Sequence, residues 1–354
     1  MVTAFEHGAP MPEPFDALAV DLARFQVANV AGYARLCAAR GVDPARLACA
    51  GDAPAVPTDA FKRAHVFAFD AADAAATFRT SGTTLGARGV HFMRDVATYD
   101  AAALAFGRSM LARELDDTVP VVVVGPSADE ASDSSLAHMC SRFVRALAPR
   151  PDAPTYFVRD GALDLDGLRS RIAALAPGPP ALLLATSFAL VHLLDALGGE
   201  TLPMPPGSRV MQTGGFKGKS REVAADELRR DVAQAFAVAE RAVIGEYGMT
   251  ELSSQFWEGT LVDERARHGV YRAPPWARVV AVDPETLAPV PRGEVGIARI
   301  EDLANVDSAF AVLTQDRVKS LDDGFELLGR APGAPPRGCS IALDEMLSSA
   351  EGDR

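Results

Sequence analysis

The sequence has few of the features that mark secreted, metal-binding or membrane-spanning proteins. Its 354 residues include only four cysteines, and none lies in a CxxC pair, so neither a disulfide framework nor a zinc knuckle is encoded. No window reaches the run of ~18 apolar residues that a membrane helix needs. The N-terminal segment also lacks the basic and apolar regions of a signal peptide. We therefore expect a cytoplasmic protein with reduced thiols and no membrane span.

Basic residues are outnumbered by acidic ones. Thirty-five lysines and arginines face 47 aspartates and glutamates, which gives a formal net charge of −12. Such a chain repels polyphosphate backbones and anionic lipid, so we expect no nucleic-acid partner. With 48% hydrophobic and 23% charged residues, the chain has enough apolar material for a large buried core. These values indicate a globular protein of enzyme size.

Hydrophobic patterning predicts an α/β fold. Helical spacing of apolar residues from Phe15 to Cys37 predicts a small N-terminal helical cap. Further on, short apolar runs alternate with amphipathic stretches, which is typical of parallel strands covered on both faces by crossover helices. The expected strands are 119–124, 155–158, 181–185 and 209–211, and the expected helices are 136–147, 165–175 and 188–197.

After about residue 272 the pattern changes to short β-rich runs without long helices between them. These runs are 278–282, 295–300, 310–313 and 325–328, which suggests an antiparallel subdomain or barrel. We therefore divide the chain into a helical cap (1–55), an α/β core with this β-rich part (56–330), and a short C-terminal tail that contains Cys339 (331–354).

One segment, Thr80 to Gly89, combines four hydroxyls, three glycines and one arginine in ten residues. Small residues let backbone amides curve around an anion, hydroxyls add donors, and the cation offsets phosphate charge. The pattern is neither GxxxxGK[ST] nor GxGxxG. A polar surface hairpin loop would have a similar composition. The candidate phosphate ligands are Thr80, Ser81, Gly82, Thr83, Thr84 and Arg88.

A second segment, Tyr247-Gly248-Met249-Thr250-Glu251, follows the apolar run 242–244. The end of a strand in an α/β sheet is where ligands bind. Tyr247 is suited to stack on a base, Thr250 to donate to a phosphate, and Glu251 to hold Mg²⁺ beside that phosphate. The structural alternative is the start of a helix with Thr250 as its N-cap.

Together the two segments resemble the adenylate-forming superfamily, which pairs a Ser/Thr/Gly-rich phosphate loop with a Tyr-Gly-x-Thr-Glu segment. Downstream, Thr314-Gln315-Asp316 and Gly329-Arg330 match in order the superfamily's ribose-binding Thr-Gly-Asp and its hinge Gly-Arg. The resemblance implies ATP and Mg²⁺ as cofactors, and it places Asp316 on the ribose with Arg330 close by. The chain departs from the superfamily pattern at Leu85, Arg88 and Gln315.

Within that superfamily the chain most resembles the LuxE-type acyl-protein synthetases, which activate fatty acids for bacterial bioluminescence reductases. The matching stretches are Phe61-Lys62, 78–89, 133–136, 212–222, 246–256 and 337–340. In this resemblance Gly214 and Gly215 form an adenine-binding turn. Lys217 and Lys219 fit that turn or a solvated loop equally well, and we assign no role to His138 or His192, which packing alone would explain.

The resemblance implies a reaction in two stages. ATP activates a fatty or other carboxylic acid as an acyl-adenylate, with Thr250 and Glu251 at the phosphates. Cys339 then carries the acyl group to a partner acyl reductase. Only 24 residues follow Arg330, so we expect the superfamily's large C-terminal lid domain to be absent.

Two alternative functions remain, and Cys339 has an alternative role of its own. One is a ligase similar to phenylacetate-CoA ligases, which releases an acyl-CoA or aryl-CoA. Another is a non-catalytic binding subunit of a biosynthetic complex. For Cys339 alone, the alternative is a small buried residue packing a helix over 341–347.

Overall fold

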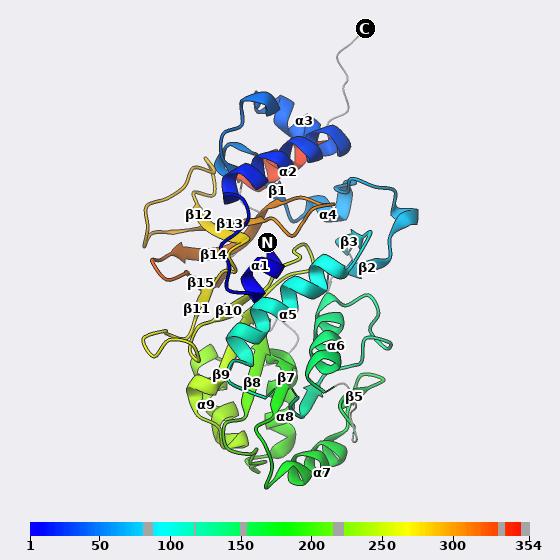
Figure 1. The fold of residues 1–354 in the computed structure, drawn as a ribbon, viewed down its shortest axis with the longest axis vertical. Coiled ribbons are helices and arrows are strands. Elements are labelled where there is room, and N and C mark those ends of the chain that lie inside the picture. Colours follow the sequence, from blue (N-terminus) through cyan, green and yellow to red (C-terminus); the bar gives the residue numbers. More distant parts are fainter. Residues whose placement is uncertain (81–87, 117, 149–153, 215–222, 332–336, 348–354) are drawn as a thin grey trace. The chain divides into compact units, whose positions relative to one another are not determined.

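The structure, a computed structural model, describes residues 1–80, 88–116, 118–148, 154–214, 223–331 and 337–347 (Figure 1). The chain forms two compact units, each built from segments that are distant in the sequence. Unit 1 contains Met1–Ala105, Met249–Gln255 and Arg272–Arg354, and unit 2 contains Phe106–Gly248 and Phe256–Tyr271. The division at residues 55 and 330 inferred from the sequence follows chain order and stays a prediction.

Unit 2 is built on a parallel sheet whose neighbouring strands follow one another along the chain. The order is β4 (Val121–Val124), β7 (Leu182–Thr186), β8 (Arg209–Thr213) and β9 (Val243–Tyr247), and β10 (Phe256–Glu258) adds to β9 in the antiparallel direction. Because parallel strands need long crossovers, helices connect them. These helices are α6 (Ser135–Leu147), α7 (Leu165–Leu175), α8 (Ser187–Leu197) and α9 (Ala225–Phe236).

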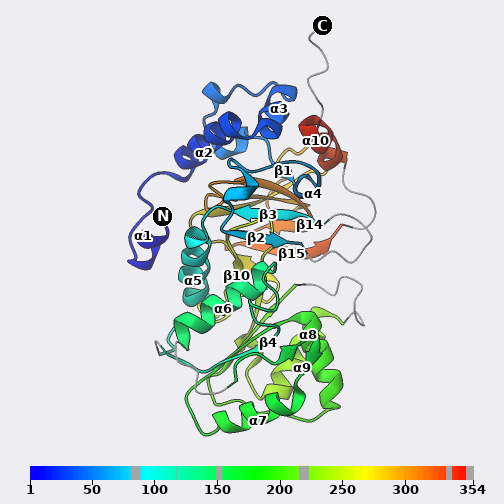
Figure 2. The same cartoon turned by 90° about the vertical axis from the view of Figure 1, so that its right-hand side faces the viewer.

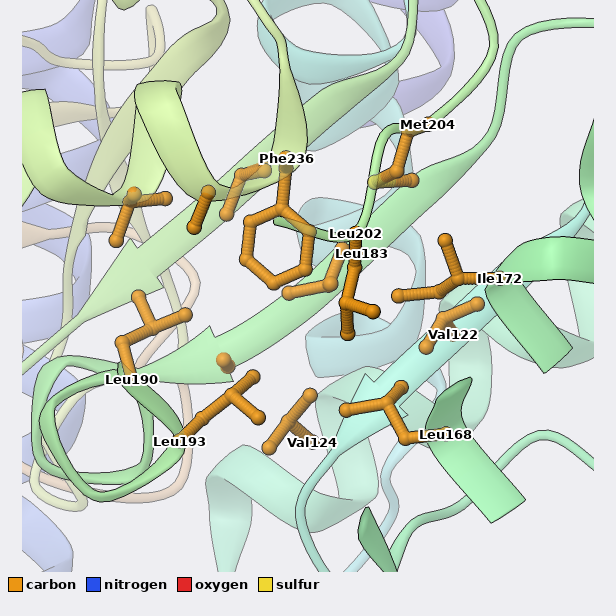
Figure 3. Close-up of a cluster of buried hydrophobic side chains, with 14 of the residues drawn as sticks. Val122, Val124, Leu168, Ile172, Leu183, Leu190, Leu193, Leu202, Met204 and Phe236 are labelled. Carbon is orange, nitrogen blue, oxygen red and sulfur yellow. The ribbon is translucent and has the colours of Figure 1, made fainter. Parts of the chain in front are cut away.

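The core of unit 2 lies between this sheet and three of the helices. Val122, Val124 and Leu183 point from the strands into a cluster with Ile172 of α7 and Phe236 of α9 (Figure 3). The alternate residues of the same strands are also buried on the opposite face. Both faces of the parallel sheet are therefore shielded from water, which explains why the sequences of these strands are continuous apolar runs.

Local signals place the helix starts of unit 2 close to the expected positions. The side chains of Ser134, Asp164 and Thr186 accept hydrogen bonds from the backbone N–H groups three residues ahead and cap α6, α7 and α8. The expected strand 155–158 is confirmed in part. It runs beside β4, where the Val123 N–H donates to the Thr155 carbonyl at 2.8 Å and the Phe157 N–H donates to the Val123 carbonyl at 3.0 Å, but the regular pairing is limited to one parallel bridge at Tyr156. Val158–Arg159 (β5) then forms a short antiparallel hairpin with Ala162–Leu163 (β6).

Unit 1 contains the antiparallel sheet expected from the β-rich C-terminal third. The order is β12 (Ala277–Val282), β13 (Val295–Asp302), β14 (Ala311–Ser320) and β15 (Phe325–Arg330), and β1 (Val56–Pro57) pairs with β14 in parallel. A separate hairpin joins β2 (Ala76–Arg79) to β3 (Val90–Met93). The antiparallel expectation is confirmed.

The N-terminal helices of unit 1 differ slightly from the expected single run. The chain forms α2 (Phe15–Asn29) and α3 (Ala31–Ala39), because Val30 adopts an extended backbone between them. The C-terminal helix α10 (Arg337–Leu347) packs beside α3 (Figure 2). The short elements of unit 1 are α1 (Val2–Glu6), α4 (Ala60–Arg63) and the 3-10 helices η1 (Pro44–Arg46), η2 (Ala50–Asp52) and η3 (Ala71–Asp73).

Three elements complete the chain. Helix α5 (Ala97–Leu111) and strand β11 (Val270–Arg272) contain residues of both units, and η4 (Glu240–Ala242) precedes β9. Across the described residues, every helix falls short of the combined length and apolar character needed to cross a membrane.

Candidate active site

The segment rich in Ser, Thr and Gly is the connection of the β2–β3 hairpin in unit 1. At its base the Thr80 N–H donates to the Gly89 carbonyl at 2.9 Å, and the Gly89 N–H donates to the Thr80 Oγ1 at 2.9 Å. The Arg88 guanidinium donates to the carbonyl of Thr80 at 2.6 Å, and also to the carbonyl of Arg79. These bonds fix both ends of the loop. The predicted ligands Ser81, Gly82, Thr83 and Thr84 lie outside the described residues.

The Tyr-Gly-x-Thr-Glu segment ends strand β9 and continues as an irregular connection to β10. Residues 248–255 contain a single backbone turn, from the Leu252 N–H to the Met249 carbonyl, and no helix follows. The alternative in which Thr250 caps a helix is therefore wrong. Thr250 is half-buried and Glu251 is buried, with 7% of its surface exposed.

The structure brings Glu251 to the base of the hairpin within unit 1. A methyl group placed on Gly89 would lie 3.7 Å from Glu251 Oε1 and 3.0 Å from Thr80 Cγ2. The contact with the carboxylate would be an ordinary van der Waals contact and the one with Thr80 a tight one, so the base of the hairpin and Glu251 are direct neighbours. The described end of the predicted phosphate loop and the predicted metal-binding glutamate are therefore neighbours.

Buried side chains from distant elements fix the backbone of residues 250–254. His91 Nδ1 lies 2.7 Å from the Thr250 carbonyl, and Asn305 Nδ2 donates to the Glu251 carbonyl at 3.0 Å. The carboxylate of Asp302 accepts from the backbone N–H groups of Ser253 and Ser254. His91, Asn305 and Asp302 could not be picked out from the sequence, since an isolated polar residue gives no periodic signal.

Asp316 and Arg330 face each other across the antiparallel pair β14–β15. The Asp316 N–H donates to Thr314 Oγ1 at 3.0 Å, and Asp316 is half-buried within β14. Asp316 therefore lies inside a strand and not in an exposed turn. Gln315 connects this pair to the rest of the unit, because its side chain accepts from Arg330 at 3.1 Å and donates to Asp59 at 3.1 Å.

Cys339 lies in the first turn of α10 with 3% of its surface exposed. Its Sγ is 3.9 Å from the Thr314 carbonyl. Burial, followed by the negative charge of Asp59, raises the pKa of the thiol to about 11. The thiolate is therefore disfavoured in this conformation, since a buried thiol loses the solvation that its anion needs.

Unit 2 contains the remaining predicted contacts of the nucleotide base. Gly214 follows β8, is exposed and has a φ of +76°, a backbone conformation that favours glycine. Tyr247 ends β9, and its ring lies 5.9 Å from that of Phe256 and 6.0 Å from that of Tyr271. Gly248 is half-buried. Gly215, Lys217 and Lys219 lie outside the described residues.

Beside Tyr247, the carboxyl group of Glu246 is buried on the opposite face of β9. The Thr213 hydroxyl donates to it from the neighbouring strand β8. Burial raises the pKa of Glu246 to about 7, although the Thr213 hydrogen bond opposes the shift. The pKa of Cys140 rises to about 12, first through burial and then through the charge of Glu246. The strand ends of unit 2 therefore hold a carboxyl group that titrates near neutrality.

Neither histidine singled out in the sequence lies among these residues. His192 is on the exposed face of α8, where its ring contacts Phe188 with 4.4 Å between centroids. His138 is half-buried on α6. The aromatic pair Phe256 and Trp257 is fully buried in β10, and Trp257 packs against Phe143.

The chain is similar to known proteins over most of its length. A family model described as "Acyl-protein synthetase, LuxE" matches residues 15–348. A curated relative, the "Long-chain-fatty-acid--luciferin-component ligase" of Vibrio harveyi, is 22% identical over 312 residues, which is 84% of this chain and 79% of that protein.

Solved structures of ligases share the fold. A 2-hydroxyisobutyryl-CoA ligase in complex with R3-HIB-AMP aligns with a TM-score of 0.65 at 14% identity, over 89% of this chain and 66% of that one. ATP-bound MatB from Rhodopseudomonas palustris aligns with a TM-score of 0.50 at 18% identity, over 74% of this chain. This chain covers 49% of the MatB chain. The likeness establishes the fold of the adenylate-forming ligases.

Proposed function

Because the chain belongs to the LuxE family of acyl-protein synthetases, we propose that it activates a long-chain fatty acid with ATP and then transfers the acyl group through Cys339 to a partner acyl reductase. The family match across residues 15–348, which includes both nucleotide segments, is the observation that carries the proposal. The position of Glu251 beside Gly89 at the hairpin base supports it from the structure.

In the first step the carboxylate oxygen of the acid attacks the α-phosphorus of ATP. The bond to the β-phosphate oxygen breaks, and pyrophosphate leaves with the bonding electron pair. The enzyme contributes position and charge neutralisation rather than a covalent group. We assign Thr80, Ser81, Gly82, Thr83, Thr84 and Arg88 to the phosphates, with Thr250 donating from the facing segment.

Glu251 is the residue that would hold Mg²⁺. Within the described residues no cluster of three His, Cys, Asp or Glu side chains forms a dedicated metal cage. A single carboxylate nevertheless fits this ion, because Mg²⁺ keeps several waters and is commonly bound by one or two carboxylates together with substrate phosphates. When bound, the ion would neutralise charge on those phosphates.

The nucleoside contacts follow the same assignment. Asp316 accepts hydrogen bonds from the ribose hydroxyls, because a carboxylate that faces a diol makes two strong bonds at once. Arg330, its cross-strand neighbour, supplies positive charge close by. Gly214, Gly215, Tyr247 and Gly248 contact the adenine, with the tyrosine ring offering a face for stacking.

In the second step the sulfur of Cys339 attacks the acyl carbonyl carbon. A C–S bond forms, the bond to the phosphate oxygen of AMP breaks, and the thiol loses its proton. In the described conformation this sulfur is buried and its pKa is raised, so the start of α10 has to move before transfer. That burial equally favours a second candidate, a ligase that passes the acyl group to soluble coenzyme A.

A pyrophosphate-exchange assay with a panel of carboxylic acids tests the proposal. We expect exchange that depends on a long-chain acid and falls by orders of magnitude in Glu251→Gln, which removes the metal-binding charge while keeping the shape of the side chain. Glu301→Gln, a buried glutamate of β13 in the same unit, is the control. Exchange at the wild-type rate in Glu251→Gln would contradict the assigned role, and release of acyl-CoA would favour the second candidate.

A further inference from the structure

His91 occupies a buried position directly after the predicted phosphate loop. It lies on β3, pairs in register with Phe78 of β2, and exposes 2% of its surface. Only two residues separate it from Arg88 at the end of the loop. Its ring nitrogen reaches the Thr250 carbonyl, 159 residues away in the sequence, at 2.7 Å. The hairpin and the Tyr-Gly-x-Thr-Glu segment are thus joined by one side-chain hydrogen bond.

Aromatic neighbours fix the plane of the His91 ring. Phe67 stacks on it with 5.7 Å between centroids and an interplanar angle of 29°, and Phe61 meets it edge to face at 5.7 Å. With Phe67 stacked on one face, the ring makes its polar contact with the Thr250 carbonyl through an in-plane nitrogen. A carbonyl oxygen accepts and never donates, so the proton is on Nδ1. Burial also lowers the pKa of His91 to about 4, which keeps the ring neutral.

The segment that His91 contacts has little regular structure of its own. Residues 248–255 belong to neither a helix nor a strand. Their direction therefore depends on the side chains that bind their backbone, namely His91 at Thr250, Asn305 at Glu251 and Asp302 at Ser253 and Ser254. Of these three, His91 is the one that comes from the hairpin carrying the phosphate loop.

We propose that His91 is a positioning residue for acid activation, in which its Nδ1–H holds the Thr250 carbonyl and so sets the direction of Glu251 relative to the phosphate hairpin. The expected effect on acid activation rests on the proposed function. The ordering of residues 250–254 by His91 does not depend on that function. Catalytic groups need positions held to within about 0.5 Å, which makes a single buried anchor consequential.

Three substitutions of His91 separate the hydrogen bond from packing. His91→Leu removes the donor. His91→Asn keeps an N–H close to the place of Nδ1, whereas His91→Gln carries its amide one bond further out. Phe67→Leu is the matched control, because it weakens the packing around the ring without touching the hydrogen bond. The readouts are pyrophosphate exchange with a long-chain acid and backbone amide hydrogen exchange of residues 250–254.

We expect His91→Leu and His91→Gln to lower kcat of exchange at least about tenfold, the range for loss of one buried hydrogen bond, with KM for the acid unchanged. Their amides at 250–254 should exchange faster than in the wild type. His91→Asn should restore most of the rate and the protection, and Phe67→Leu should keep both.

Wild-type amide protection in both His91→Leu and His91→Gln would overturn the inference whatever the activity. So would a Phe67→Leu variant that reproduces the loss, or a His91→Asn variant as slow as His91→Leu. The proposed function fails by a different result, which is the absence of acid-dependent exchange in the wild type with every acid of the panel. In that case the amide measurements still decide whether His91 positions the segment.

Discussion

We expect the buried carboxyl group of Glu246 to make the stability of the protein depend on pH near neutrality. Glu246 exposes 5% of its surface, and its hydrogen bond comes from Thr213 on the neighbouring strand. Burial raises its pKa from 4.5 to about 7. Glu246→Gln removes the titration while leaving an oxygen that accepts from the Thr213 hydroxyl.

The direction in which the free energy of unfolding changes with pH depends on whether the folded or the unfolded state binds the proton. Between pH 4.5 and 7 the unfolded chain has released the proton of Glu246, whereas the folded chain still binds it. The folded state therefore binds more protons in this window, and the free energy of unfolding falls as pH rises. A rise of the Glu246 pKa from 4.5 to about 7 corresponds to about 3 kcal/mol, because each tenfold change in an ionisation constant is about 1.4 kcal/mol.

Urea titrations at pH 5 and pH 8 measure this effect. We expect the wild-type free energy of unfolding to drop by up to about 3 kcal/mol between the two values, relative to Glu246→Gln. The variant should consequently be the more stable protein at pH 8 and should lose most of that advantage at pH 5.

Glu258→Gln is the matched control on the adjoining strand β10. Glu258 is equally buried, but its carboxylate accepts from the Gly245 and Gly269 N–H groups and contacts His268 Nδ1 at 3.1 Å. An amide there turns its NH₂ group toward a backbone donor, so this variant should be less stable at both pH values. A wild type and Glu246→Gln with the same pH dependence would refute the reasoning.

Three further predictions concern the nucleotide and the thiol in unit 1. Asp316→Ala should raise KM for ATP at least tenfold, since charged hydrogen bonds contribute about 1.5–3 kcal/mol each, and an unchanged KM would remove the ribose assignment. With ATP and labelled fatty acid, Cys339→Ser should lose the hydroxylamine-sensitive protein label yet keep pyrophosphate exchange, and a retained label would show that another group carries the acyl chain. Arg40→Ala breaks the 2.8 Å ion pair with Glu345 that ties α10 to α3, and should speed alkylation of Cys339 about fivefold, for a partly exposed pair of about 1 kcal/mol. Alkylation at the wild-type rate would mean that the ion pair does not limit exposure of the thiol.

The regular elements were predictable because their signals are local. Helix α7 begins and ends at the residues that periodicity indicated, Leu165 and Leu175, because its apolar spacing and its N-cap lie within a dozen residues. The strands of the parallel sheet were found for a similar reason, since burial on both faces makes them continuous apolar runs. The expected strand at 155–158 pairs with β4 over a short stretch only and its last residue joins the β5–β6 hairpin, because so short an apolar run fits a sheet edge and a hairpin equally well.

The composition of two short segments, and their order along the chain, was enough to indicate the family. Whether those segments meet depends on contacts between residues far apart in the sequence. Gly89 lies beside Glu251, and Asp316 pairs with Arg330, only because two hairpins and the 249–255 connection pack into one unit.

The environment of single side chains was decided by tertiary structure alone. Cys339 is the clearest case, because the sequence identifies its place in a family motif, whereas its burial depends on α10 packing against α3 and β1. His91 has no sequence signal at all, since its partner is a backbone carbonyl, which every residue has. Periodicity along the chain records which faces are apolar, but a hydrogen bond between a side chain and a distant backbone group exists only once the fold brings the two together.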